Sequence, residues 1–156
     1  MGPSGHCFVV GAQGSFRLEV VQSSVRRIRL LAILDESHEK EVVYDRFGMK
    51  WSLTHLRSRW KNTWLGALLA HSFNPLVDAQ VSWSKPQPYG LDELKACYLT
   101  ALEPTGKLQT AAPGPQLQAQ LKGRIREAQT FDELIEVHRA IALVPGRGAA
   151  PMAVAR

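Results

Sequence analysis

The chain has 156 residues, 45% of them hydrophobic and 21% charged, with a formal net charge of +5, which is the composition of a globular domain that buries a core. No apolar run approaches the ~20 residues of a membrane-spanning helix, and the N-terminus lacks the basic segment of a secretory signal. Cys7 and Cys97 have neither the number nor the spacing of a disulfide framework or a thiolate zinc site, so we expect a cytoplasmic location, no membrane association and no metal.

The two ends of the chain are rich in small residues. Residues 1–15 contain four glycines and predict a flexible N-terminal arm, with one short strand over 7–10 as its only regular element. Residues 145–156 consist mainly of Gly, Ala, Pro and Arg without periodicity, and predict a disordered tail. We therefore expect a single α+β domain over residues 16–144.

Alternating hydrophobicity predicts strands in the first half. The pattern indicates one strand from Phe16 to Val20 and a second over residues 28–34. Two further runs, 41–44 and 49–53, flank a tetrapeptide with Asp first and Gly last, which is typical of a type I turn in a hairpin. These four strands are expected to form an antiparallel meander.

The stretch 53–70 admits two interpretations. Helical spacing of Leu53, Leu56, Trp60 and Trp64 favours one amphipathic helix, whereas the apolar run that begins at Trp64 is also typical of a buried strand preceded by a helix or turn. We favour the second by a small margin. Beyond it, alternation over 77–83 predicts another strand.

The last third of the chain has helical spacing. Asp92 and Glu93 suit the first turn of a helix that begins at Leu91 and ends before Pro104. Pro115 favours a second helix start, and Thr130 with Glu133 forms a capping box for a third. The overall expectation is an α+β fold: an antiparallel sheet of about four to six strands from residues 16–84, packed by three helices from residues 91–143.

The excess positive charge is confined to one segment. No acidic residue occurs between Asp45 and Asp78, while the remaining basic and acidic residues of the chain balance. Three of the four tryptophans share this segment, namely Trp51, Trp60 and Trp64. Its basic residues are Arg46, Lys50, Arg57, Arg59 and Lys61.

Three interpretations of this segment remain open. The tryptophans can fill the core while the basic side chains are solvated, and we expect at least two of the three to be core residues. Exposed Trp rings can instead stack on the bases of a single-stranded nucleic acid whose phosphates contact Arg and Lys. Trp and Arg are also common binding hot spots, which suits an acidic protein partner.

Motifs for enzyme chemistry are missing from the sequence. Neither a phosphate-binding glycine loop followed by Lys and Ser or Thr, nor a Gly-x-Ser-x-Gly elbow, occurs. Cys97 and His138 are interpreted as packing residues on helices. We expect no catalytic residues and no cofactor, and an enzyme is the least favoured class.

The sequence therefore predicts a small non-enzymatic protein-interaction or regulatory module that binds an acidic protein partner. Single-stranded nucleic-acid binding through the same segment is the alternative. In both cases we expect the contacts to come from Arg46, Lys50, Arg57, Arg59, Trp60 and Lys61.

Overall fold

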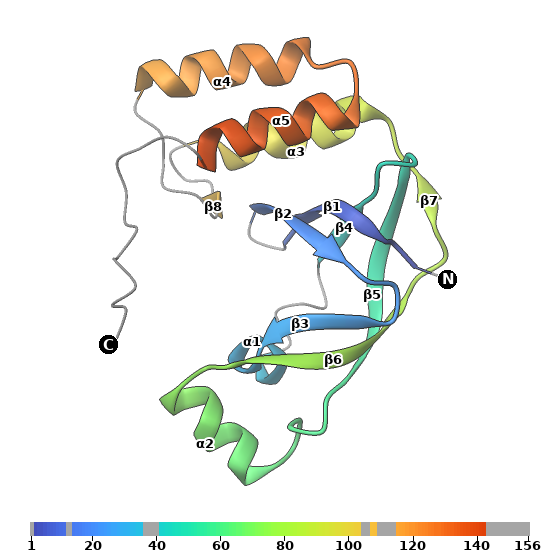
Figure 1. The fold of residues 1–156 in the computed structure, drawn as a ribbon, viewed down its shortest axis with the longest axis vertical. Helices are drawn as coiled ribbons and strands as arrows, with labels where there is room; N and C mark the ends of the chain where they lie inside the picture. Colours follow the sequence, from blue (N-terminus) through green and yellow to red (C-terminus); the bar gives the residue numbers. More distant parts are fainter. Residues whose placement is uncertain (1, 12–13, 36–40, 104–106, 109–114, 143–156) are drawn as a thin grey trace, which may run out of the picture.

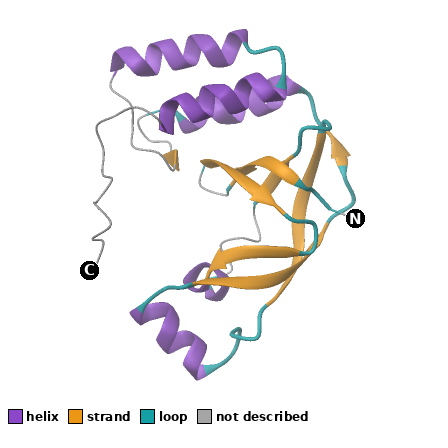
Figure 2. Ribbon diagram, in the orientation of Figure 1, coloured by secondary structure: helices purple, strands orange, loops and turns teal. Residues whose placement is uncertain are grey.

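The computed structural model describes residues 2–11, 14–35, 41–103, 107–108 and 115–142. Its fold is α+β, as predicted: a strongly curved, largely antiparallel sheet comes from the N-terminal half, and helices from the C-terminal half pack over one end of it (Figures 1 and 2). The predicted tail, residues 145–156, lies outside the described residues.

The sheet does not follow the chain order. Its strands are β1 (Gly5–Val10), β2 (Ser15–Val21), β3 (Val25–Arg29), β4 (Val42–Tyr44), β5 (Met49–Arg57), β6 (Leu76–Trp83), β7 (Gln87–Pro88) and β8 (Lys107–Leu108). They are arranged in the order β3-β6-β5-β4-β1-β2-β8, with β7 beside β5. Every pairing is antiparallel except that of β2 with β8. The predicted meander is therefore wrong in its pairing, because β3 contacts β6 instead of the strands before and after it in the sequence.

In the described part of the chain, five helices accompany the sheet. They are α1 (Leu30–Leu34), α2 (Trp64–Ser72), α3 (Leu91–Ala101), α4 (Pro115–Glu127) and α5 (Phe131–Ala142). The last three confirm the predicted helical segment and form a layer at one end of the sheet, whereas α1 and α2 lie at the opposite end (Figure 1). The molecule thus has two separate helical regions joined by the sheet.

The predicted hairpin is confirmed in β4 and β5. Gly48 has a φ of 77°, a conformation that costs glycine little and other residues more. Asp45 Oδ1 accepts hydrogen bonds from the backbone N–H groups of Phe47 and Met49, at 2.9 and 3.0 Å. Asp45 Oδ2 accepts a third from Trp51 Nε1 at 2.8 Å, so one buried carboxylate fixes both the turn and a core tryptophan.

The segment expected to be a flexible arm contains a central strand, and the short strand predicted over residues 7–10 is confirmed within it. β1 pairs with β2 along its whole length and with β4 over Phe8–Val10, and the side chains of Cys7, Phe8 and Val9 are fully buried. Phe8 packs against the C-terminal helices, whereas Cys7 and Val9 pack on the other side with Trp51. A strand buried on both faces lacks polar alternation, and its glycine-rich flanks resembled an arm.

The strand predicted over 28–34 is a strand only in its first two residues. β3 ends at Arg29, and Leu30–Leu34 form the one-turn helix α1. The backbone N–H of Leu30 donates to Pro75 O at 3.0 Å, and that of Leu31 donates to Asn74 Oδ1 at 3.0 Å. This loop, far away in the sequence, provides the acceptors that start the helix.

Neither interpretation of residues 53–70 is correct. Strand β5 continues to Arg57, and a turn then leads into helix α2. Thr63 Oγ1 accepts a hydrogen bond from the N–H of Gly66 at 3.0 Å and so caps the helix. A Cβ at Gly66 would lie 2.2 Å from Trp60 O, which means that only glycine permits this close approach of helix and turn.

The C-terminal helices enclose an aromatic core. Phe16 stacks on Tyr98 with ring centroids 4.3 Å apart, and Phe8 contacts Phe131 edge-on at 5.1 Å. His138 is buried among them and shares a 2.9 Å hydrogen bond with the Tyr98 hydroxyl. Burial lowers the pKa of His138, so the imidazole is a neutral packing residue, as the sequence indicated.

Candidate interaction surface

The predicted basic site is divided between the two ends of β5. Lys50 lies near its start and Arg57 at its end. Their Cα atoms are seven residue steps apart along the extended strand, which corresponds to about 23 Å. The six predicted contact residues therefore do not form one surface.

Arg46 and Lys50 are engaged with the C-terminal helices. Arg46 forms a 2.8 Å ion pair with Asp132, and Lys50 forms one of 2.8 Å with Glu93. The hydrogen bond from Lys50 lowers the pKa of Glu93, which also accepts a hydrogen bond from Tyr44. These two cations link the hairpin to α3 and α5, and their charge is matched within the fold.

Arg57, Arg59, Trp60 and Lys61 lie at the other end of the sheet, before α2. Arg57 and Arg59 are exposed, whereas Trp60 and Lys61 are half-buried. The Arg59 guanidinium carbon is 4.9 Å from the centre of the Trp60 ring, within cation–π range. One face of this tryptophan is thus already occupied by Arg59.

The three tryptophans of the segment have three different environments. Trp51 is buried against Cys7, Val9 and the turn carboxylate, while Trp60 packs in part against the core beneath α2. Trp64, by contrast, is 79% exposed. The expectation that at least two fill the core is wrong, because only Trp51 is buried, while Trp60 is half-buried.

The structure places two further arginines near this end of the sheet, outside the basic segment that the sequence singled out. Arg27 and Arg29 are exposed on β3, and the register places them opposite Asp78 and Leu76 of β6. Arg57 of β5 is opposite Gln80, so these residues share one face of the β3-β6-β5 sheet. We call this the outer sheet face and define it by the exposed residues Arg27, Arg29, Arg57, Leu76, Asp78 and Gln80.

The sequence signal that could have identified Arg27 and Arg29 was their alternation with buried Ile28.

The outer sheet face is positively charged. Asp78 is its one acidic residue and pairs with Arg27 at 3.1 Å. Arg29 donates to Asn74 O at 2.9 Å, and neither Arg29 nor Arg57 forms an ion pair with any described residue. Strand spacing places the Cα atoms of Arg29 and Arg57 about 16 Å apart, with Arg59 just beyond the sheet.

A second cluster of charges is enclosed in the sheet. Arg26 is 5% exposed and forms ion pairs with Glu19 and Glu41, at 2.8 and 2.6 Å, and Arg17 contacts the same two carboxylates. Burial would raise the Glu19 pKa, but the neighbouring Arg26 and Arg17 outweigh it and lower that pKa. These four charges neutralise one another and offer nothing to a partner.

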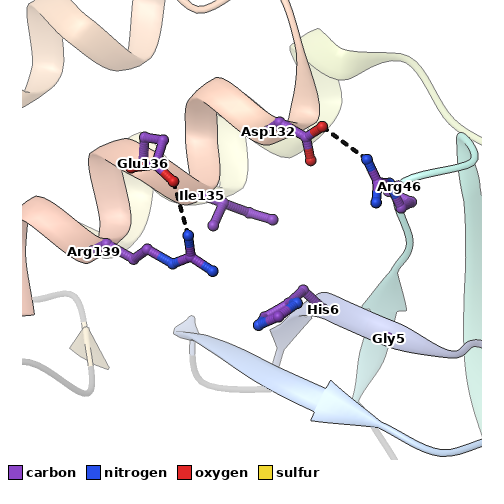
Figure 3. Close-up of a pocket in the computed structure, with 7 residues that line it drawn as sticks. All are labelled: Gly5, His6, Arg46, Asp132, Ile135, Glu136 and Arg139. Atoms are coloured by element: carbon purple, nitrogen blue, oxygen red, sulfur yellow. Dashed lines mark hydrogen bonds and ion pairs between the residues drawn. The ribbon is translucent and has the colours of Figure 1, made fainter.

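A hollow of about 370 Å³ lies between β1, the β4–β5 hairpin and α5 (Figure 3). Its charged groups are paired: Arg46 of the hairpin with Asp132 across the hollow, and Arg139 with Glu136 along α5 at 2.8 Å. The His6 ring lies beside them in Figure 3. The hollow therefore has no excess charge with which to select an ionic ligand.

The two cysteines have different surroundings. Burial raises the pKa of the Cys7 thiol to about 12, so this thiol is protonated at neutral pH. Cys97 Sγ lies 4.0 Å from the Tyr44 hydroxyl. Within the described ranges no three His, Cys, Asp or Glu side chains are placed to hold a metal ion, and no helix is long and apolar enough to cross a membrane.

No known protein family, curated protein or solved structure matches this chain.

Proposed function

We propose that this protein is a small interaction module that binds an acidic protein segment through the outer sheet face and the adjoining Arg59. The observation that carries the proposal is the set of three exposed arginines, Arg29, Arg57 and Arg59, without an ion-pair partner in the described part of the chain. Around them the sequence from 46 to 77 contains no acidic residue. A surface of this kind attracts carboxylates and is suited to bidentate Arg contacts.

The sheet face favours an acidic protein over a single-stranded nucleic acid. Stacking on bases needs aromatic rings on the basic surface, and the residues that define the outer sheet face include none. Trp60, next to Arg59 in the sequence, has one of its ring faces covered by Arg59. Carboxylates need only the guanidinium groups, which this face provides.

The test compares two triple variants of equal charge change. One replaces Arg29, Arg57 and Arg59 by Gln, and the control replaces Arg124, Arg126 and Arg139, which lie on α4 and α5. Fluorescence anisotropy measures the affinity for a polyglutamate peptide and for single-stranded and duplex oligonucleotides, at low and at physiological salt. The first variant should weaken peptide binding at least tenfold and reduce its salt dependence, while the control remains close to wild type.

Equal losses in both triple variants would mean that only net charge matters, and the proposed site would be rejected. Tighter binding of an oligonucleotide than of the peptide, lost in the first variant alone, would assign the face to nucleic acid instead. Circular dichroism on each variant establishes that the fold is intact.

A further inference from the structure

Helix α2 presents an uncharged apolar face to solvent. With about 100° between successive residues, Gly66 and Ala70 lie on the side that faces the core, and Trp64, Leu65 and Leu68 lie on the opposite side. Leu68 is at the centre of this exposed face and is 54% exposed, while Trp64 is 79% exposed. None of these residues belongs to the outer sheet face, although Arg59 of the proposed function precedes the helix.

We infer that this face of α2 pairs with the α2 of a second copy of the chain, in an antiparallel arrangement about a two-fold axis at Leu68. The α2 face, defined as Trp64, Leu65 and Leu68 with the exposed His71 and Ser72, contains no Lys, Arg, Asp or Glu. The face itself therefore offers an acidic protein or an anionic lipid surface no Lys or Arg side chain to recognise. The α2 face is suited to contact with another apolar face that also lacks Lys, Arg, Asp and Glu.

The area is sufficient for a specific pair. Burying a large aromatic side chain removes up to about 250 Å² from water, so Trp64 with the two leucines offers roughly 400 Å² per copy. Two copies bury roughly 800 Å² of apolar surface, and homodimer interfaces are about 65% apolar, which gives a total interface of about 1,200 Å². This value lies at the lower limit for specific complexes.

The antiparallel arrangement matches large with small side chains. Trp64 and Ser72 are each four residues from Leu68, so the two-fold axis places Trp64 over Ser72 of the partner subunit. The small serine leaves room for the indole ring, as interdigitation of helix faces requires. At the axis, Leu68 meets the partner's Leu68.

The charges flanking α2 favour the same arrangement. Arg59 and Lys61 precede the N-terminal end of α2, and an antiparallel partner brings its C-terminal end to this position. The C-terminal carbonyl groups of a helix carry a partial negative charge that attracts cations. A parallel pair would instead bring the two basic turns together.

Sedimentation equilibrium of the full chain tests the pairing, from low micromolar to submillimolar concentration. We expect a monomer–dimer equilibrium in the wild type, and Leu68→Glu should raise the dissociation constant at least a hundredfold. The matched control is Phe47→Glu at the hairpin tip, where the side chain is 72% exposed, and this variant should dimerise like the wild type. A monomeric wild type, or dimers unaffected by Leu68→Glu, would overturn the inference.

A cross-link identifies the axis even if Leu68→Glu disturbs the fold. Helices pack with their axes about 8–10 Å apart, which brings the Cα atoms of a central residue within disulfide range. In a Cys97→Ser background, Leu68→Cys should form a disulfide-linked dimer under mild oxidation, and Phe47→Cys should not. Absence of that dimer, or a monomer that co-sediments with phosphatidylserine vesicles through Trp64, would reject the self-pairing.

Discussion

Replacement of Trp51 by Ala should cost much more stability than replacement of Trp64 by Ala, although both residues belong to the same basic segment. Trp51 is 6% exposed, and its Nε1 donates to Asp45 Oδ2. Truncation of a buried Trp costs about 3–5 kcal/mol. Asp45 keeps its two backbone donors, so we expect a loss of about 4 kcal/mol for Trp51→Ala, without a further large penalty for the carboxylate.

Trp64→Ala should change the free energy of unfolding by no more than about 0.5 kcal/mol, because an exposed side chain has little to lose on truncation. Trp51→Phe should cost an intermediate free energy of unfolding, because an aromatic ring still fills the core. The lost hydrogen bond to the Asp45 carboxylate accounts for about 1.5–3 kcal/mol. Urea unfolding, followed by circular dichroism at low protein concentration, measures all three without a contribution from pairing through α2. A loss below about 1 kcal/mol for Trp51→Ala would refute the assignment of Trp51 to the core. A loss for Trp64→Ala as large as that for Trp51→Ala would refute the contrast.

The remaining predictions concern the turn, α2 and two titrating groups. Gly48→Val should destabilise by about 1–2 kcal/mol in urea unfolding and Gly48→Asn by less, because Asn tolerates positive φ; equal costs would contradict the argument. Gly66→Ala should lower Tm by disturbing the close contact of α2 with its preceding turn, and an unchanged Tm would count against that contact. The folded state holds the pKa of His138 below its unfolded value of about 6.5, so the unfolded state binds more protons. Stability should therefore be complete above that pH and fall below it, and His138→Gln should flatten this slope. The lowered pKa of Glu19 likewise contributes stability above the unfolded value of about 4.3, which is lost as the pH falls through the folded value. In Glu19→Gln this acid-dependent loss should shrink, whereas an unchanged pH profile would show that the ion pairs with Arg26 and Arg17 do not form in solution.

Local patterns determined several parts of this protein without tertiary information. The alternation of apolar and polar residues predicted β2 and β6, and the turn from Asp45 to Gly48 predicted the hairpin. Pro115 and the Thr130 cap predicted where α4 and α5 begin. Thr130 Oγ1 accepts from the N–H of Glu133 at 3.2 Å, while the Glu133 carboxylate accepts from the N–H of Gln129. Each of these features depends on residues within a few positions of one another, so the sequence alone contains the relevant interactions.

Tertiary contacts decided the elements that local patterns misplaced. α1 begins at Leu30 because Pro75 and Asn74 supply acceptors from a distant loop, and β1 is ordered because both of its faces are covered. The residues of the candidate surface were likewise decided by tertiary contacts. Counting charge located Arg57 and Arg59, but only the strand order β3-β6-β5 brings Arg29 to their side and leaves Arg46 and Lys50 paired at the far end of β5. Strand order depends on long-range packing, and no short window of sequence contains it.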